Sequence, residues 1–95
     1  MSETVATASA LLTNEVGLHA RPSVKLTQLA KSFRARIAVA IAPEGPWVDA
    51  KSPVKIMRVR APRGARLHVR AEGADAGAAV NAVIALIEND FGDHG

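Results

Sequence analysis

The sequence contains no cysteine, which excludes disulfide bonds, thiolate zinc sites and a cysteine nucleophile. Its only aromatic residues are Phe33, Trp47 and Phe91, so few side chains could stack on nucleobases. No apolar run approaches the roughly 20 residues that a membrane-spanning helix needs. The N-terminus also lacks the basic start and apolar run of a signal peptide. These absences favour a cytoplasmic protein that binds neither membranes nor nucleic acid.

The hydrophobic content is sufficient for one small core. The chain has 95 residues, of which 48% are hydrophobic, and this length suits a single domain. We expect the domain to span 1–95, with an ordered core from about residue 4 to residue 91. The 12 basic and 9 acidic side chains give a formal charge of +3. This charge favours acidic partners: an acidic protein, phosphate or nucleic acid.

Apolar residues recur at helical spacing in two segments, 20–33 and 75–91. They are Leu26, Leu29, Ala30 and Phe33 in the first segment, and Val80, Val83, Ile84, Ile87 and Phe91 in the second. Asp75 is a suitable cap for the second of these helices. A further short helix is predicted over 52–60, because Ser52 is a good N-cap and Pro53 fits the first helical position.

Alternating apolar and polar residues predict four strands, at 4–13, 36–42, 47–51 and 66–72. The resulting order is β-α-β-β-α-β-α. This order predicts a two-layer α+β domain. We expect an open-faced sandwich, in which three helices cover one face of a four-stranded antiparallel sheet. The outward residues of the last strand, such as Arg66 and Arg70, are polar. The other face of the sheet is therefore expected to lie in water.

His19 stands at the predicted start of the first helix. Proline is tolerated in the first turn of a helix, so Pro22 places that start close to His19. The free N–H groups and the positive end of the helix dipole make such a position an anion site. Arg21 adds a guanidinium that can grip a phosphate, and Gly17 allows a tight turn before the site.

This combination describes a histidine that accepts a phosphoryl group and passes it on. The imidazole would be the nucleophile, and the helix end and Arg21 would hold the phosphate. The alternative is that His19 is an ordinary surface residue or helix cap. No residues near His19 have the spacing of metal ligands. The other two histidines are isolated: we interpret His68 as a solvated strand residue and His94 as part of a frayed tail. Neither a metal nor a cofactor is expected.

Two stretches resemble a known family. The segment NEVGLHARP, from Asn14 to Pro22, resembles the active-site signature of the histidine-containing phosphocarrier family, HPr, of the bacterial phosphoenolpyruvate-dependent phosphotransferase system. The segment AKSPVKIM, from Ala50 to Met57, is similar to the family's serine-containing second helix. The resemblance covers roughly residues 4–90. It implies the same open-faced sandwich, and a monomeric carrier rather than a free-standing enzyme.

The resemblance also implies site residues and partners. His19 would be phosphorylated through its Nδ1 atom, and Arg21 would stabilise the phosphohistidine. Enzyme I would be the donor, and a sugar-permease or regulatory phosphotransferase domain the acceptor. Ser52 matches a serine that a dedicated kinase/phosphorylase modifies in some branches. Pro53 follows it where regulated members usually carry Ile or Leu, so Ser52 can equally be read as a simple helix cap. Arg60 stands where the family usually has a glycine.

The exposed side of the two helices next to His19 is the candidate partner surface. In the short helix, Ile56 and Val59 share the face suited to the core, which leaves Val54 and Met57 on another face. Apolar residues exposed beside basic ones suit the docking of acidic partners; alternatively, this pair completes the core under a loop. The candidate surface comprises Ala20, Val24, Gln28, Val54, Met57 and Arg58.

The leading hypothesis is a phosphoryl carrier that serves sugar uptake or its regulation. Two alternatives remain. One is a carrier in a regulatory phosphorelay, with nitrogen-type partners or a dihydroxyacetone kinase. The other, from a different class, is a small basic nucleic-acid-binding module, which the scarcity of aromatic residues disfavours.

Overall fold

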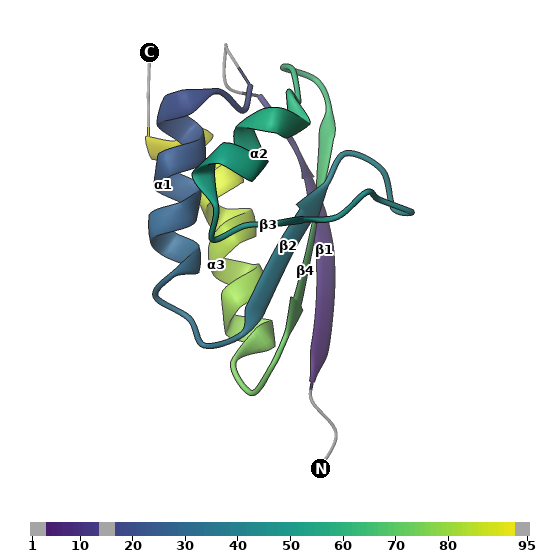
Figure 1. Cartoon of the computed structure of the whole chain (residues 1–95), viewed down its shortest axis with the longest axis vertical. Helices are drawn as coiled ribbons and strands as arrows, with labels where there is room; N and C mark the ends of the chain where they lie inside the picture. Colours follow the sequence, from purple (N-terminus) through teal and green to yellow (C-terminus); the bar gives the residue numbers. More distant parts are fainter. Residues whose placement is uncertain (1–3, 14–16, 93–95) are drawn as a thin grey trace.

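The computed structural model of the chain describes residues 4–13 and 17–92. The elements follow the predicted order β-α-β-β-α-β-α (Figure 1). They are β1 (Val5–Leu11), α1 (Ala20–Ala30), β2 (Arg36–Ala40), β3 (Val48–Asp49), α2 (Pro53–Val59), β4 (Arg66–Glu72) and α3 (Ala76–Glu88), followed by a 3₁₀ turn, η1 (Asp90–Gly92).

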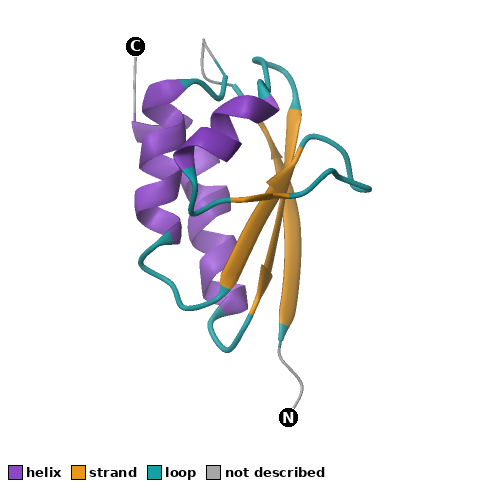
Figure 2. Cartoon of the chain, in the orientation of Figure 1, coloured by secondary structure: helices purple, strands orange, loops and turns teal. Residues whose placement is uncertain are grey.

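The four strands form one antiparallel sheet in the order β1-β4-β2-β3. The three α-helices lie on one side of this sheet, and none of the described residues forms a helix on its other face (Figure 2). The predicted two-layer, open-faced α+β sandwich is therefore confirmed.

The core lies between the sheet and the helices, and all three helices contribute buried residues to it. Alternate residues of β4, Leu67, Val69 and Ala71, are buried as predicted, and Val69 pairs with Ala8 of β1 and Val39 of β2. Burying one Val, Leu or Ile side chain stabilises a fold by about 1.5–3 kcal/mol. The contact of α3 with the sheet is therefore a main source of stability in so small a domain. The α3 residues buried in this layer are Ala76, Ala79, Val80, Val83 and Ile87.

Two helices are shorter than the sequence predicted. α1 ends at Ala30, and Phe33 lies in the turn that follows, where its half-buried side chain still packs against the core. α3 ends at Glu88, and Phe91 has a φ of 57°, which lies outside the α-helical range. The turn nevertheless buries the Phe91 side chain. Apolar spacing thus correctly predicted that Phe33 and Phe91 pack against the core. It wrongly placed them in helices, because a turn can also direct a side chain into the core.

Asp75 precedes α3 as predicted, but its side chain does not cap the helix. Its two carboxylate oxygens instead accept hydrogen bonds from the N–H of Arg34, at 2.9 Å, and from the N–H of Ala35, at 2.8 Å. These bonds tie the start of α3 to the turn before β2. Because they stabilise the charged carboxylate, the bond from Arg34 first, they hold the pKa of Asp75 below its ordinary value of 3.8.

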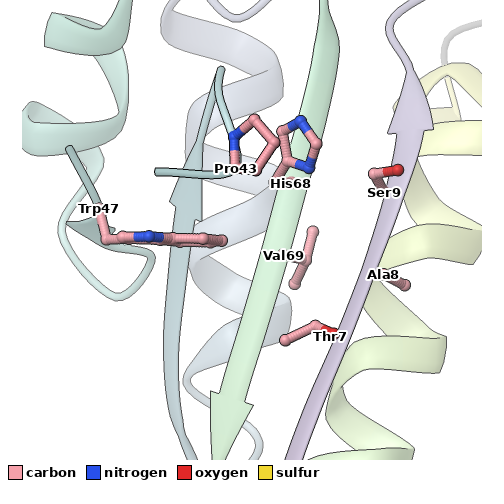
Figure 3. A pocket seen from close by; sticks show the side chains of 7 residues that line it. All are labelled: Thr7, Ala8, Ser9, Pro43, Trp47, His68 and Val69. Carbon is pink, nitrogen blue, oxygen red and sulfur yellow. The ribbon is translucent and has the colours of Figure 1, made fainter. Parts of the chain in front are cut away.

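The hairpin between β2 and β3 differs from the prediction and covers part of the open face. β3 has two residues rather than the predicted 47–51. The loop before it brings Pro43 and Trp47 over the sheet, where they line a hollow of about 310 Å³ together with Thr7, Ser9 and His68 (Figure 3). His68 is therefore half-buried rather than fully solvated.

We predict that Asp75→Asn lowers the melting temperature at neutral pH, because an amide offers the two N–H groups one neutral oxygen in place of a carboxylate. Since folding lowers the pKa of Asp75 below 3.8, its contribution to stability is complete above that value. It is lost as the pH falls through the folded pKa. Thermal unfolding followed from pH 7 to pH 2 should show the two curves converging at the acid end. A difference that stays constant with pH would exclude the charge as its cause.

Candidate functional site

The chain reaches α1 through a tight turn at Gly17. This residue has a φ of +66°, and a β-carbon on it would lie 2.3 Å from the carbonyl oxygen of Ala61, so only glycine fits. The next residue, Leu18, is buried, and its N–H donates a hydrogen bond of 2.9 Å to that carbonyl oxygen. The loop before α1 is thus held against the segment after α2. Residues 14–16 of the signature, and His94, lie outside the described residues.

His19 is the N-cap of α1, as the position of Pro22 predicted. Its backbone is extended, with φ −114° and ψ −160°, and its carbonyl oxygen accepts the N–H of Ser23 at 3.0 Å. The side chain makes no capping hydrogen bond and is exposed. The imidazole can therefore meet a partner without first breaking a cap.

The surroundings of the imidazole suit an anion. The first N–H groups of a helix have no acceptor within it, and the helix dipole makes this end positive. The first turn of α1 contains no acidic residue to neutralise that end. Arg21 lies in this turn and is exposed. The histidine, helix end and guanidinium that the sequence predicted are thus present together.

The end of α2 lies next to His19. In Figure 1 the C-terminal end of α2 and the start of α1 lie at the same end of the molecule. His19 and Ala20, at the start of α1, line one hollow of about 380 Å³ together with Met57 and Arg60, at the end of α2. The other described residues that line it are Leu18, Ala61 and Pro62. The fold thus brings Met57, from the candidate partner surface, to the histidine.

α2 presents the two faces that its spacing predicted. Ile56 is fully buried, and Val59 packs against the core. Val54 is 52% exposed, and Met57 is half-buried where it lines the hollow. The alternative in which Val54 completes the core is therefore wrong.

The other residues of the candidate surface are also accessible. Ala20, Val24 and Gln28 on α1 and Arg58 on α2 are all exposed. The two helices pack against each other, side by side in Figure 1. Both can therefore contribute to one surface that extends from the hollow.

Ser52 caps α2, as predicted. Its side-chain oxygen accepts the N–H of Lys55 at 3.3 Å, and Pro53 occupies the first turn. The nearby Ala50 carbonyl accepts a hydrogen bond from the hydroxyl of Thr27, at 3.0 Å. Thr27 lies eight residues from His19, about 12 Å along α1. Ser52 thus belongs to the far end of the helix pair and does not line the hollow at His19.

Two features of the site were not predicted. Arg60 lines the hollow, and the only signal for it in the sequence was its departure from the family's usual glycine. The C-terminal turn also braces the segments around His19: the hydroxyl of Thr13 donates to Asp90 at 2.5 Å, and the ammonium of Lys25 donates to the Phe91 carbonyl at 2.8 Å. Nothing in the sequence indicated these pairs, because each joins residues more than 60 positions apart.

Within residues 4–13 and 17–92, no three acidic or histidine side chains are placed to hold a metal ion. Over the same residues, no helix has the length and apolar content to cross a membrane. His68, the other described histidine, lies on the helix-free face of the sheet, away from the hollow at His19 (Figure 3).

We predict that Ser52→Ala lowers the free energy of unfolding by about 1 kcal/mol, because it removes the N-cap of α2. Ser52→Asp is the matched control: a carboxylate also caps a helix and suits its dipole, so this variant should keep most of the stability. Chemical denaturation of the three proteins checks both values. Equal stability of Ser52→Ala and the wild type would show that the cap contributes nothing.

Comparison with known proteins gives matches that span this site. A protein-family model described as "PTS HPr component phosphorylation site" matches residues 6–89. The phosphocarrier protein HPr of Cupriavidus necator is 42% identical over 80 residues, which are 84% of this chain and 88% of that protein. The phosphocarrier protein NPr of Escherichia coli K12 is 34% identical over 80 residues, with the same two coverages of 84% and 88%.

A solved structure agrees with the fold. The crystal structure of HPr from Thermoanaerobacter tengcongensis matches with a TM-score of 0.85 at 33% sequence identity. The match covers 95% of this chain and 99% of that one. The similarity therefore includes the sheet, all three helices and the loop that carries His19.

Proposed function

This chain belongs to the HPr family of phosphocarrier proteins of the phosphotransferase system, and from this premise we propose that His19 is the residue that takes up and passes on the phosphoryl group. The observation that carries the proposal is the position of His19. It is an exposed N-cap without a side-chain capping bond, at the start of a helix whose first turn contains no acidic residue. An imidazole in that position can reach a donor and hold an anion.

The transfer requires one nitrogen of His19 to attack phosphorus. The new N–P bond forms while the bond from phosphorus to the donor breaks, and the electron pair of that bond stays with the donor. We assign the attack to Nδ1, as the family resemblance implies. Handing the group to the acceptor is the same exchange with the roles reversed, so His19 is regenerated.

Arg21 and the helix end stabilise the transferred group. Three phosphoryl oxygens carry the negative charge through the reaction, and a protein assists chiefly by placing positive charge beside them. The guanidinium of Arg21, two residues after His19, can donate two parallel hydrogen bonds to such oxygens. Arg21 is exposed in the first turn of the helix that His19 caps.

The partners we propose are enzyme I as donor and a phosphotransferase acceptor domain. They would dock on Ala20, Val24 and Gln28 of α1 and on Val54, Met57 and Arg58 of α2. Among the described residues that line the hollow at His19, none is acidic, which favours partners with an acidic surface. The similarity to an NPr supports a second candidate, a carrier in a regulatory branch. Phosphorylation rates with a sugar-type and a nitrogen-type enzyme I separate the two.

We predict that His19→Ala abolishes phosphorylation by phosphoenolpyruvate and enzyme I while the domain stays folded, because the exposed ring makes no cap. His68→Ala is the control, since His68 lies on the open face of the sheet, and it should be labelled fully. Mass spectrometry and circular dichroism give the two readouts. The label on the wild type should also be acid-labile, as a phosphoramidate is. Full labelling of His19→Ala would refute the proposed role.

We predict that Met57→Glu keeps most of the melting temperature but weakens binding to enzyme I by about 1–3 kcal/mol, the range for a hot-spot residue. Its side chain is half-buried at the hollow rather than in the core. Ile56→Glu is the matched control and should unfold the domain, because Ile56 has no exposed surface and a charge there would be unpaired. A well-folded Ile56→Glu beside an unfolded Met57→Glu would reverse this assignment of the faces.

A further inference from the structure

Arg60 holds an unfavourable backbone conformation beside the active histidine. It follows the last residue of α2 and has φ 54° and ψ 40°, the left-handed region. In this region the β-carbon of an ordinary residue crowds the following carbonyl, and glycine or asparagine is the usual occupant. The arginine thus costs stability that a glycine at the same position would restore. Strain of this kind persists mainly where a side chain has a function.

The backbone of the turn has a clear structural role. The N–H of Arg60 donates to the Met57 carbonyl at 3.2 Å, which closes the end of α2. The next residue, Ala61, then presents its carbonyl to the N–H of Leu18, at 2.9 Å, and so supports the loop of His19. This explains why the chain turns left-handed at residue 60. It does not explain the arginine, because a glycine makes the same turn at lower cost.

The position of Arg60 beside His19 suggests a role for its side chain in binding phosphate. Arg60 is exposed, and it lines the hollow of about 380 Å³ that His19 and Ala20 also line. Arg21 lies in the first turn of α1, two residues beyond His19. A phosphoryl group on His19 would therefore have a guanidinium on α1 and another at the end of α2. Arginine binds phosphate oxygens through two parallel N–H groups, which suits both positions.

We propose that Arg60 is a second phosphate-binding residue of the site, whose guanidinium contacts the phosphoryl oxygens on His19. This inference rests on the proposed function, in which His19 carries the phosphoryl group. Arg60 makes and breaks no covalent bond. Its contribution is positive charge and hydrogen bonds, and these explain why the strained arginine is retained.

The proposal predicts opposite effects on stability and on transfer. Arg60→Gly and Arg60→Asn relieve the left-handed strain, so their melting temperatures should equal or exceed that of the wild type. Both lose the guanidinium, so phosphoryl transfer from enzyme I should slow by on the order of tenfold, as expected when one charge-assisted contact is lost. Arg60→Lys keeps the charge and the strain, and its rate should lie between these values. Arg63→Ala is the charge-matched control: Arg63 is exposed but does not line the hollow, so its rate should stay within about twofold of wild type.

A second measurement tests the contact itself. In the isolated protein, phosphorylation of His19 should shift the NMR resonance of the Arg60 side-chain Nε–H, because the new anion lies beside it. Unchanged transfer in both Arg60→Gly and Arg60→Asn would overturn the proposal. So would slowed transfer without any shift of this resonance, because the side chain would then serve the partner and not the phosphoryl group. The wild-type reaction separates this outcome from failure of the proposed function: if His19 is not phosphorylated at all, the proposed function itself fails.

Discussion

One hydrogen bond, from the N–H of Leu18 to the carbonyl oxygen of Ala61, joins the loop before α1 to the turn after α2. The rest of the site depends on this contact. A β-carbon on Gly17 would lie 2.3 Å from the Ala61 oxygen, so only glycine fits there. His19 comes directly after Leu18, so its exposed ring lies beside the end of α2. Met57 and Arg60 reach the hollow for the same reason.

The exposed side chains of the site adjoin the core. All three helices contribute residues to the core, and two core residues, Leu18 and Ala61, also line the hollow at His19. His19 and Arg60 themselves are exposed, so their charge and strain do not disturb the packing of the core. The C-terminal turn connects the two regions, because Asp90 and the Phe91 carbonyl bind Thr13 and Lys25 around the His19 loop. The ring of Phe91 fixes that turn in the core.

The predictions that succeeded used local rules. Pro22 located the start of α1 and hence the capping position of His19; Ser52 and Pro53 did the same for α2. Alternation in β4 predicted which of its residues are buried. The predictions that failed needed contacts between distant segments. Asp75 binds the turn before β2 in place of its own helix, and Phe91 reaches the core from a turn. The role of the Arg60 position depends on Ala61 meeting Leu18, which no local pattern contains.

NMR of the phosphorylated, nitrogen-labelled protein tests whether the phosphoryl group resides on His19. If it does, one phosphorus resonance should appear after incubation with phosphoenolpyruvate and enzyme I, coupled to the Nδ1 atom of the His19 ring. This coupling should disappear when the phosphoryl group passes to an acceptor domain. A phosphorus resonance coupled to His68, or one that belongs to a serine ester, would contradict the proposed role of His19.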